Sequence, residues 1–285
     1  MTIVAVHGIA NRLKGLAPDE AAAELSKRWR SKLQQGFASA GLDDHPLPAL
    51  HAAYYAHHTT TTGAERQSDG PDLDSLDEPE RDFVVAWALS SGSPALHEQQ
   101  GLATAPLRQL LSWVARRRGV PLGTVTRFAV RLAGEVRRYL HVPQVRDAAR
   151  SIVAEAIRRA RPRVVLAHSL GSVVTYEALH AHPELEVECF VTLGSPLGLA
   201  GGVFDHLLPA PVTDRGSRPA GVGYWANLAD TGDLVAIPPR LGDRFPVDQH
   251  ADTHMGLIDF HTFGTYLASP LTAATIAPFI RPEPR

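Results

Sequence analysis

The sequence predicts an α/β fold, with a mostly parallel sheet of about six strands that helices flank on both faces. Two observations carry this prediction. Short apolar runs recur along the chain and alternate with longer segments of helical periodicity. In addition, residues 163–177 read as a strand, a sharp turn and a helix in direct succession. A chain of 285 residues, 44% of them hydrophobic, is long enough for one such core with an insertion.

Each strand is predicted from a short apolar run that turn formers or polar residues bound. A helix is expected at 18–39, where Pro18-Asp19-Glu20 opens a segment with an apolar face. Further helices are expected to begin at Pro143 and directly after the turn near residue 169, and a last one to lie within 258–280. The strands are expected at 3–6, 49–55, 164–166, 187–193, 224–229 and 245–250.

Residues 59–141 interrupt this alternation of strands and helices. The segment starts with a polar stretch rich in Thr, Gly, Ser and Asp, and helices are then expected near 82–90, 106–118 and 124–140. We therefore expect two parts, a core formed by residues 1–58 and 142–285 and a helical, Arg-rich insertion at 59–141.

The turn within 163–177 has the pattern of a nucleophile elbow, G-x-S-x-G. It reads Ala167-His168-Ser169-Leu170-Gly171. Such a turn holds its serine in a strained backbone conformation, so the residues two before and two after must be small. Ala167 and Gly171 meet that demand, and Ser169 is the expected nucleophile.

A second copy of the pattern, Ala88-Leu89-Ser90-Ser91-Gly92, is an internal control. Pro94 would break the helix that must leave an elbow, and the acidic run before this copy looks like a helix start. We therefore interpret Gly92 as the C-terminal cap of a helix. Only Ser169 has the expected structure on both sides.

Four motifs together resemble the α/β-hydrolase superfamily, in its lipase- and esterase-like branch. They are the elbow, the His7-Gly8 step after the first strand, Thr-x-Gly-Ser-Pro at 192–196, and Asp-x-Val-x-x-Pro at 233–238. The resemblance implies a Ser169, Asp233 and His261 triad, with the amides of Ile9 and Leu170 as oxyanion donors. It also implies that the insertion forms a cap or lid. His7, Gly8, His168 and Gly171 would support the site, and packing under the elbow is the favoured interpretation of His168.

The acid and the histidine each have a competitor. Asp230 lies three residues before Asp233 and is expected to cap the turn instead. His250 and His254 precede His261, which the resemblance favours because His-x-x-x-x-Tyr-Leu and a final helix follow it. Asp233 and His261 are therefore the predicted pair, with Asp230 and His254 as the alternatives.

A metal site is the competing interpretation of the histidine-rich C-terminal part. Asp248, His250, Asp252 and His254 alternate strictly, so an extended strand would place all four on one face, and His57-His58 would add ligands. No other metal-ligand spacing occurs, and a serine elbow needs no metal. We therefore expect neither a metal nor another cofactor.

Composition limits the class of protein. The net charge of −2 gives no nucleic-acid signature, and a single cysteine, Cys189, excludes an intramolecular disulfide framework. Neither a signal peptide nor a transmembrane run is recognisable, so a cytoplasmic location is expected. The chain has 25 Arg and only 3 Lys, a bias that suggests a GC-rich bacterial genome. Residues 101–163 hold fourteen Arg and three acids, which indicates either solvated helix faces or a surface for an anionic partner or membrane.

These features predict a cytoplasmic serine hydrolase that cleaves a carboxylic ester in a small-molecule or lipid-like acyl substrate. A thioesterase, an amidase or an acyltransferase would use the same triad. The alternative from another class is a non-catalytic hydrolase-fold module that binds a partner through the Arg-rich insertion.

Overall fold

The structure is a computed structural model, and it describes residues 1–60, 73–93, 104–236, 240–253 and 261–280. Its centre is an open sheet of six parallel strands in the order β2-β1-β3-β4-β5-β6. This confirms the predicted α/β class and the parallel arrangement. The strands are β1 (Thr2–Val6), β2 (Ala49–Ala53), β3 (Val164–His168), β4 (Val187–Leu193), β5 (Val222–Asp230) and β6 (Gln249–Thr253).

The central strands are apolar because helices bury them on both faces. Along β1, Val4 and Val6 pack into one hydrophobic cluster, whereas Ile3 and Ala5 pack into the cluster on the other face. All five residues of β3 are buried in the same way. The period of two therefore divides each strand between two cores, as a sheet inside a three-layer domain requires.

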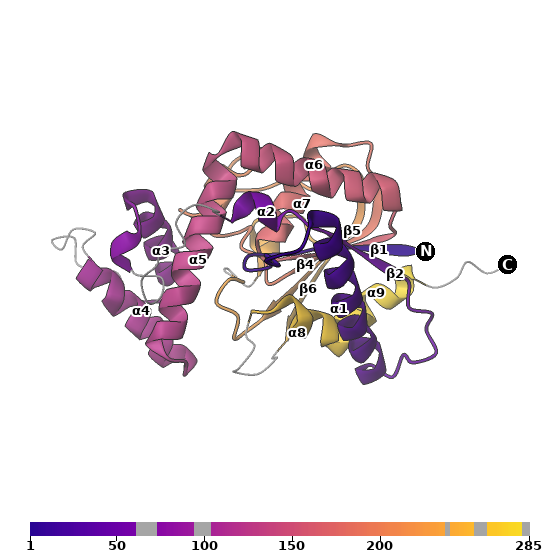
Figure 1. The fold of residues 1–285 in the computed structure, drawn as a ribbon, viewed down its shortest axis with the longest axis horizontal. Coiled ribbons are helices and arrows are strands. Elements are labelled where there is room, and N and C mark those ends of the chain that lie inside the picture. The colour runs from indigo at the N-terminus through magenta and orange to yellow at the C-terminus, as the bar shows by residue number, and fades with distance from the viewer. Residues whose placement is uncertain (61–72, 94–103, 237–239, 254–260, 281–285) are drawn as a thin grey trace.

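Helices form a layer on each face of the sheet (Figure 1). One layer contains α1 (Pro18–Ser39), α8 (Phe263–Ala268) and α9 (Pro270–Ile276), which contact one another. The other contains α6 (Pro143–Ala160) and α7 (Leu170–Ala181). A single turn of helix, α2 (Ala56–Thr59), follows β2.

The insertion at 59–141 contributes three helices that pack on one another, α3 (Glu78–Ser90), α4 (Thr104–Arg118) and α5 (Leu122–His141). They lie together at one end of the molecule, and α5 returns toward the core (Figure 1). Asp77 caps α3 by accepting the amide of Glu80 at 2.9 Å. On α5, Val125, Leu132, Val136 and Leu140 are buried and belong to the core cluster that also contains Val165 and Val174.

The predicted last strand, 245–250, was misplaced. The structure places β6 at Gln249–Thr253, so only two of the predicted residues belong to it. Phe245 is buried because its ring packs against Trp225, Tyr176 and Phe204. The hydrophobicity of Phe245 therefore serves the core from a loop and does not mark a strand.

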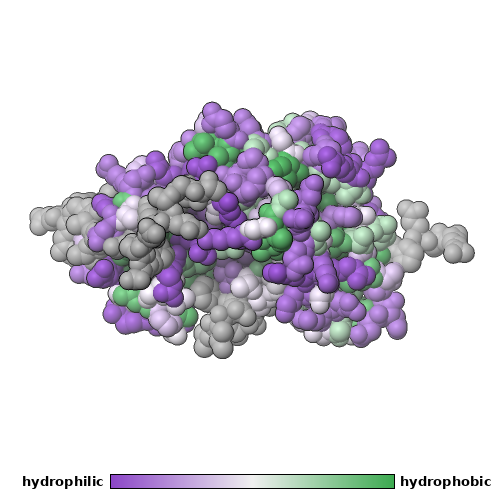
Figure 2. Space-filling model, in the orientation of Figure 1, coloured by the Kyte–Doolittle hydropathy of each residue, from purple (hydrophilic) through white to green (hydrophobic). Residues whose placement is uncertain are grey.

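Hydrophilic side chains cover most of the face drawn in Figure 2, and hydrophobic ones appear only in small patches. No helix in the described ranges combines the length and the apolarity needed to cross a membrane.

Candidate functional site

The strand, turn and helix predicted around Ser169 are present. Ser169 follows β3 directly, with φ 52° and ψ −130°, a conformation that costs a non-glycine residue energy and that the surrounding structure must hold. Its amide donates to the carbonyl of Leu193 at 3.0 Å. A side chain at Gly171 would collide with the carbonyl oxygens of His7 and Val6, so the turn needs glycine there.

The second copy of the pattern forms the predicted helix end. Ser90 is the last residue of α3 and is exposed. Gly92 has φ 87° and its amide donates to the carbonyl of Leu89, as a glycine just past a helix does. The interpretation of Gly92 as a cap is confirmed.

The loop after β1 packs against the Ser169 turn. A Cβ atom at Gly8 would collide with the Cβ of Ser169, so the glycine permits this close approach. Ile9, the next residue, is also buried, and its carbonyl accepts the side-chain amide of Asn11 at 2.8 Å. Ser169, Gly8 and Ile9 are therefore neighbours, although 160 residues separate Gly8 from Ser169 in the sequence.

His7 is buried and neutral, and its hydrogen bonds fix the loop after β1. The amide of Tyr55 donates to His7 Nε2 at 3.0 Å, so Nδ1 carries the proton and donates to the carbonyl of Gly8 at 2.8 Å. The Tyr55 hydroxyl donates to the His7 carbonyl at 2.6 Å. Burial lowers the pKa of His7 to about 4. At neutral pH the uncharged His7 side chain therefore holds the loop in place through these hydrogen bonds.

Leu170 supplies a second amide beside Ser169. It is the first residue of α7, and the first amides of a helix have no acceptor within the helix itself. The amide of Ser169 is already bound to Leu193, so it is not free for a ligand. The helix N-terminus also carries a partial positive charge. An anion at Ser169 would therefore meet favourable electrostatics.

Asp233 and His261 lie together, as the sequence predicted. His261 Nδ1 is 2.8 Å from Asp233 Oδ1 and 2.9 Å from Oδ2. The Asp233 carboxylate also accepts the Tyr266 hydroxyl at 2.6 Å and the amide of Val235 at 2.7 Å. Because Asp233 is only 1% exposed, these contacts satisfy a buried charge and fix its orientation.

The free nitrogen of His261 and the hydroxyl of Ser169 are both buried. Among the residues that the structure describes, neither Nε2 nor Oγ has a hydrogen-bond partner. The His261 ring centroid lies 4.5 Å from that of His168, the residue before Ser169. An unpartnered imidazole nitrogen and an unpartnered hydroxyl therefore lie in one buried neighbourhood, which makes them candidates for a shared role.

Asp230 has a different environment from Asp233. Its carboxylate accepts the amide of Gly232 at 2.8 Å, and its own amide donates to the Tyr266 hydroxyl at 2.9 Å. The predicted role as a turn cap agrees with these contacts. The competing histidine, His254, lies outside the described residues.

His168 packs under the turn. Its ring stacks on Phe263 at 5.3 Å, and burial lowers its pKa well below the usual value for histidine. Both findings agree with the packing role that the sequence favoured over a direct one.

The described residues of the alternative metal site have other partners or lie apart, except that His250 and Asp252 contact each other. Asp248 pairs with Arg218 at 2.7 Å, and His250 Nε2 lies 3.0 Å from Asp252. His57 and His58 are on α2, which follows the strand at the opposite edge of the sheet. Within the described ranges, no three His, Cys, Asp or Glu residues are arranged to hold a metal ion.

Sequence reasoning missed the contacts between the insertion and the Asp233 loop. Arg118 of α4 donates to the carbonyl of Thr231 at 2.6 Å, and the Trp87 indole of α3 donates to the carbonyl of Leu234. Phe128 of α5 lies edge-on to the His261 ring, with centroids 5.5 Å apart. Arginine and aromatic residues carry no sequence signal for partners more than a hundred positions away.

The residues of the candidate site lie at the carboxyl-terminal end of the parallel sheet, because each follows a strand in the sequence. Gly8 follows β1, Ser169 follows β3, Asp233 follows β5 and His261 follows β6. This end is where open α/β sheets place their ligands. Comparisons of the chain with protein-family models, with curated proteins and with solved structures gave no match.

Proposed function

We propose that this protein is a serine hydrolase that cleaves a carboxylic ester through an acyl-enzyme. One observation carries the proposal: Asp233 holds His261 through Nδ1, which leaves Nε2 without a partner among the described residues, in the same buried neighbourhood as a strained serine. A serine hydroxyl is a weak nucleophile at neutral pH, so it needs a base, and the base needs an orienting carboxylate. Asp233, His261 and Ser169 supply these three groups.

In the first half-reaction, Ser169 Oγ attacks the ester carbonyl carbon while His261 Nε2 takes the hydroxyl proton. The carbonyl oxygen becomes an oxyanion, which the amides of Ile9 and Leu170 stabilise. The intermediate collapses, the bond to the alcohol oxygen breaks, and His261 returns the proton to the leaving alcohol. The products are the free alcohol and an acyl ester of Ser169.

In the second half-reaction, His261 takes a proton from water, which attacks the acyl carbonyl. The Ser169 oxygen leaves and regains its proton from His261, so serine and the free acid are released. Asp233 keeps the imidazole in the tautomer with the proton on Nδ1 and stabilises the imidazolium that forms in each step. Burial of these groups strengthens their electrostatic effect relative to water.

The helices of the insertion would act as a cap over this site. The support is contact: Phe128 of α5 lies on His261, and α3 and α4 each donate a hydrogen bond to the loop that carries Asp233. A cap in this place would shape the acyl or alcohol pocket and keep water from the acyl-enzyme.

The direct test is turnover of short p-nitrophenyl esters by the purified chain. We expect Ser169→Ala to reduce kcat by about 10⁶-fold, because the nucleophile is gone and only binding and the oxyanion donors still accelerate the reaction. Ser90→Ala is the matched control and should retain full activity, because this serine ends a helix on the surface.

Equal activity of the wild type and Ser169→Ala would overturn the assignment. The same panel with a thioester and an anilide of the same acyl group separates an esterase from a thioesterase or an amidase, and an added alcohol acceptor reveals acyl transfer. Inertness toward all of these would favour a binding module.

A further inference from the structure

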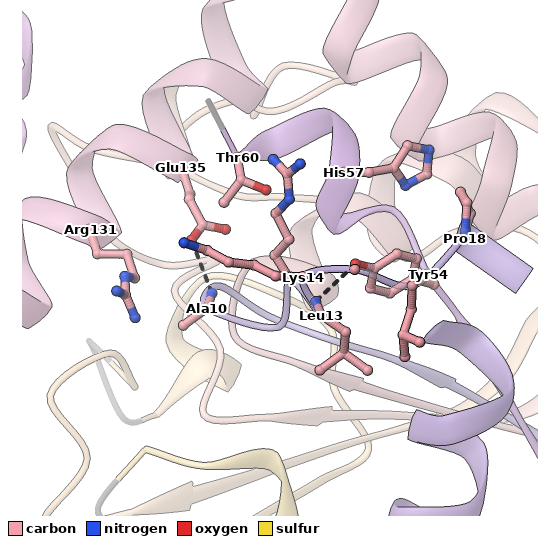
Figure 3. A pocket seen from close by; sticks show the side chains of 12 residues that line it. Ala10, Leu13, Lys14, Pro18, Tyr54, His57, Thr60, Arg131 and Glu135 are labelled. Atoms are coloured by element: carbon pink, nitrogen blue, oxygen red, sulfur yellow. Dashed lines mark hydrogen bonds between the residues drawn. The ribbon is translucent and has the colours of Figure 1, made fainter. Parts of the chain in front are cut away.

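A polar pocket of about 370 Å³ lies beside the loop after β1, between that loop, α2 and α5. Its lining includes the ionisable side chains of Arg12, Lys14, His57, Arg131 and Glu135 (Figure 3). They come from three segments that are distant in sequence. The loop after β1 lies beside α2 because β1 and β2 are neighbouring strands, and α5 of the insertion forms the remaining wall of the pocket.

The pocket carries more positive than negative charge. Arg12, Lys14 and Arg131 oppose one carboxylate, Glu135, so the charge balance is positive even when that carboxylate is ionised. Arg12 and Arg131 make no hydrogen bond or ion pair within the described part of the chain, although the charge of Arg131 acts on Glu135. Figure 3 shows Lys14 reaching toward Glu135.

Arg131 is unlike most of its neighbours in the insertion. Arg137 pairs with Asp77, Arg138 donates to the carbonyl of His58 at 2.9 Å, and Arg118 donates to that of Thr231 at 2.6 Å. These arginines fasten the helices to each other and to the core. Arg131 instead lines a cavity, so its guanidinium is placed to bind a ligand with paired oxygens.

Glu135 ties the pocket to the candidate site. It accepts the amide of Ala10 at 3.0 Å, and Ala10 holds φ 63° in the loop directly after Ile9. Ala10 also lines the pocket. The pocket therefore begins one residue from the amide proposed to stabilise the oxyanion. A substrate with its carbonyl at Ser169 would extend toward it past Gly8 and Ile9.

We propose that this pocket binds an anionic group of the substrate, a carboxylate or a phosphate a few bonds from the scissile ester. The inference rests on the proposed hydrolase function and names a substrate class for it. Arg131 and Arg12 would bind the anion by charge-assisted hydrogen bonds, with Lys14 adding to the local positive potential. Neutral esters would lack this interaction and would be poorer substrates.

The test compares two p-nitrophenyl esters with acyl chains of equal length, the valerate and the mono-glutarate, whose far end is a carboxylate. We expect kcat/KM for the glutarate half-ester to exceed that for the valerate by about tenfold or more at low salt, and the ratio to fall as salt is added. Arg131→Gln should lower this ratio about tenfold. Arg127→Gln, one turn away on α5 and outside the pocket, is the matched control and should keep the wild-type ratio.

A ratio near one in the wild type would overturn the proposal, as would equal losses for both esters in Arg131→Gln. Calorimetry with free glutarate gives an answer that does not depend on turnover. If neither ester is cleaved, the hydrolase proposal fails, and glutarate binding that Arg131→Gln weakens would still support the anion site. Glutarate binding without a preference for the half-ester would show that the pocket holds a free anion, which contradicts its role as a substrate subsite.

Discussion

Ser169 and Ser90 stand in the same five-residue pattern and adopt opposite structures. Ser169 follows a buried strand, has φ 52° and is fully buried, whereas Ser90 ends a helix and is exposed. Gly171 lies against the backbone of the neighbouring loop, while Gly92 has φ 87° past a helix end. The pattern alone does not determine the geometry. The flanking segments make the difference, because a buried apolar strand precedes Ser169 and a buried helix follows it.

The two serines also differ in their surroundings. The loop after β1 brings a backbone amide to the Ser169 side of the sheet, the loop after β5 brings a buried carboxylate, His261 brings a buried imidazole, and the start of α7 adds a second amide. Ser90 lies on the insertion, and its helix ends in solvent.

The largest effect after loss of the nucleophile is expected at Asp233. Asp233→Asn keeps the shape of the side chain but removes the charge that orients His261, so kcat for a p-nitrophenyl ester should fall about 10⁴-fold. Asp230→Asn is the matched control, because Asp230 binds the amide of Gly232 rather than the imidazole. Its kcat should change less than about tenfold. A reversed order of the two variants would assign the acid to Asp230.

The next effect is on stability, at Gly171. Gly171→Ala places a Cβ against the carbonyl oxygens of His7 and Val6, and both belong to a buried strand and loop that cannot move freely. We expect the free energy of unfolding to fall by more than about 3 kcal/mol, measured by urea denaturation. A loss below about 1 kcal/mol would show that the turn tolerates side chains and is not tightly held.

A smaller effect is expected from pH, through His7. Its pKa falls from an ordinary 6.5 to about 4 in the folded protein, so the unfolded chain takes up a proton before the folded chain does. Stability should therefore decrease as pH falls from about 6.5 to about 4, by about 3 kcal/mol for this residue. The stabilising contribution of His7 should be fully present above about pH 6.5.

The variant His7→Gln isolates this contribution. Glu135, whose pKa burial raises to about 7, acts in the opposite direction, because the folded chain binds its proton first as pH falls. Urea denaturation of both chains between pH 4 and 7 gives the difference. If the difference in unfolding free energy between wild type and His7→Gln is independent of pH, His7 does not stay neutral in the fold.

The smallest effect is expected at Gly92. Gly92→Ala forces a side chain into φ 87°, but the nearest atom is 3.7 Å away on Trp113, so only backbone strain opposes it. The unfolding free energy should fall by about 1 kcal/mol with esterase activity unchanged. If Gly92→Ala lowered the unfolding free energy as much as Gly171→Ala does, the two copies of the five-residue pattern would not differ in how tightly their glycines are packed.

The sheet was predictable because parallel strands buried on both faces are short apolar runs with few polar interruptions. The 3–6 run and the 187–193 run each had this form, and both are strands. The same rule does not hold at residue 245, because Phe245 lies in a loop and is buried by packing against aromatic rings of the core. Hydrophobicity reports burial, and burial does not require a strand.

The pairing of Asp233 with His261 was expected from the motif resemblance, which placed one residue after the fifth strand and the other after the sixth. The contacts of the insertion were not, since they depend on how three helices pack. The amide of Ala10 reaches Glu135, and Arg118 reaches the carbonyl of Thr231, across more than a hundred positions. The sequence around Glu135 and around Arg118 does not distinguish either residue from a solvated surface charge. The candidate anion pocket therefore emerged only from the structure.

The central claim is that Ser169, and not the serine in the second copy of the pattern, is an activated nucleophile. Reaction with a fluorophosphonate, followed by intact-mass measurement and peptide mapping, tests it most directly. We expect one adduct per chain, located on Ser169, which is absent from Ser169→Ala and unchanged in Ser90→Ala. An adduct that persists in Ser169→Ala, an adduct on another residue, or no adduct on the folded wild type would contradict the claim.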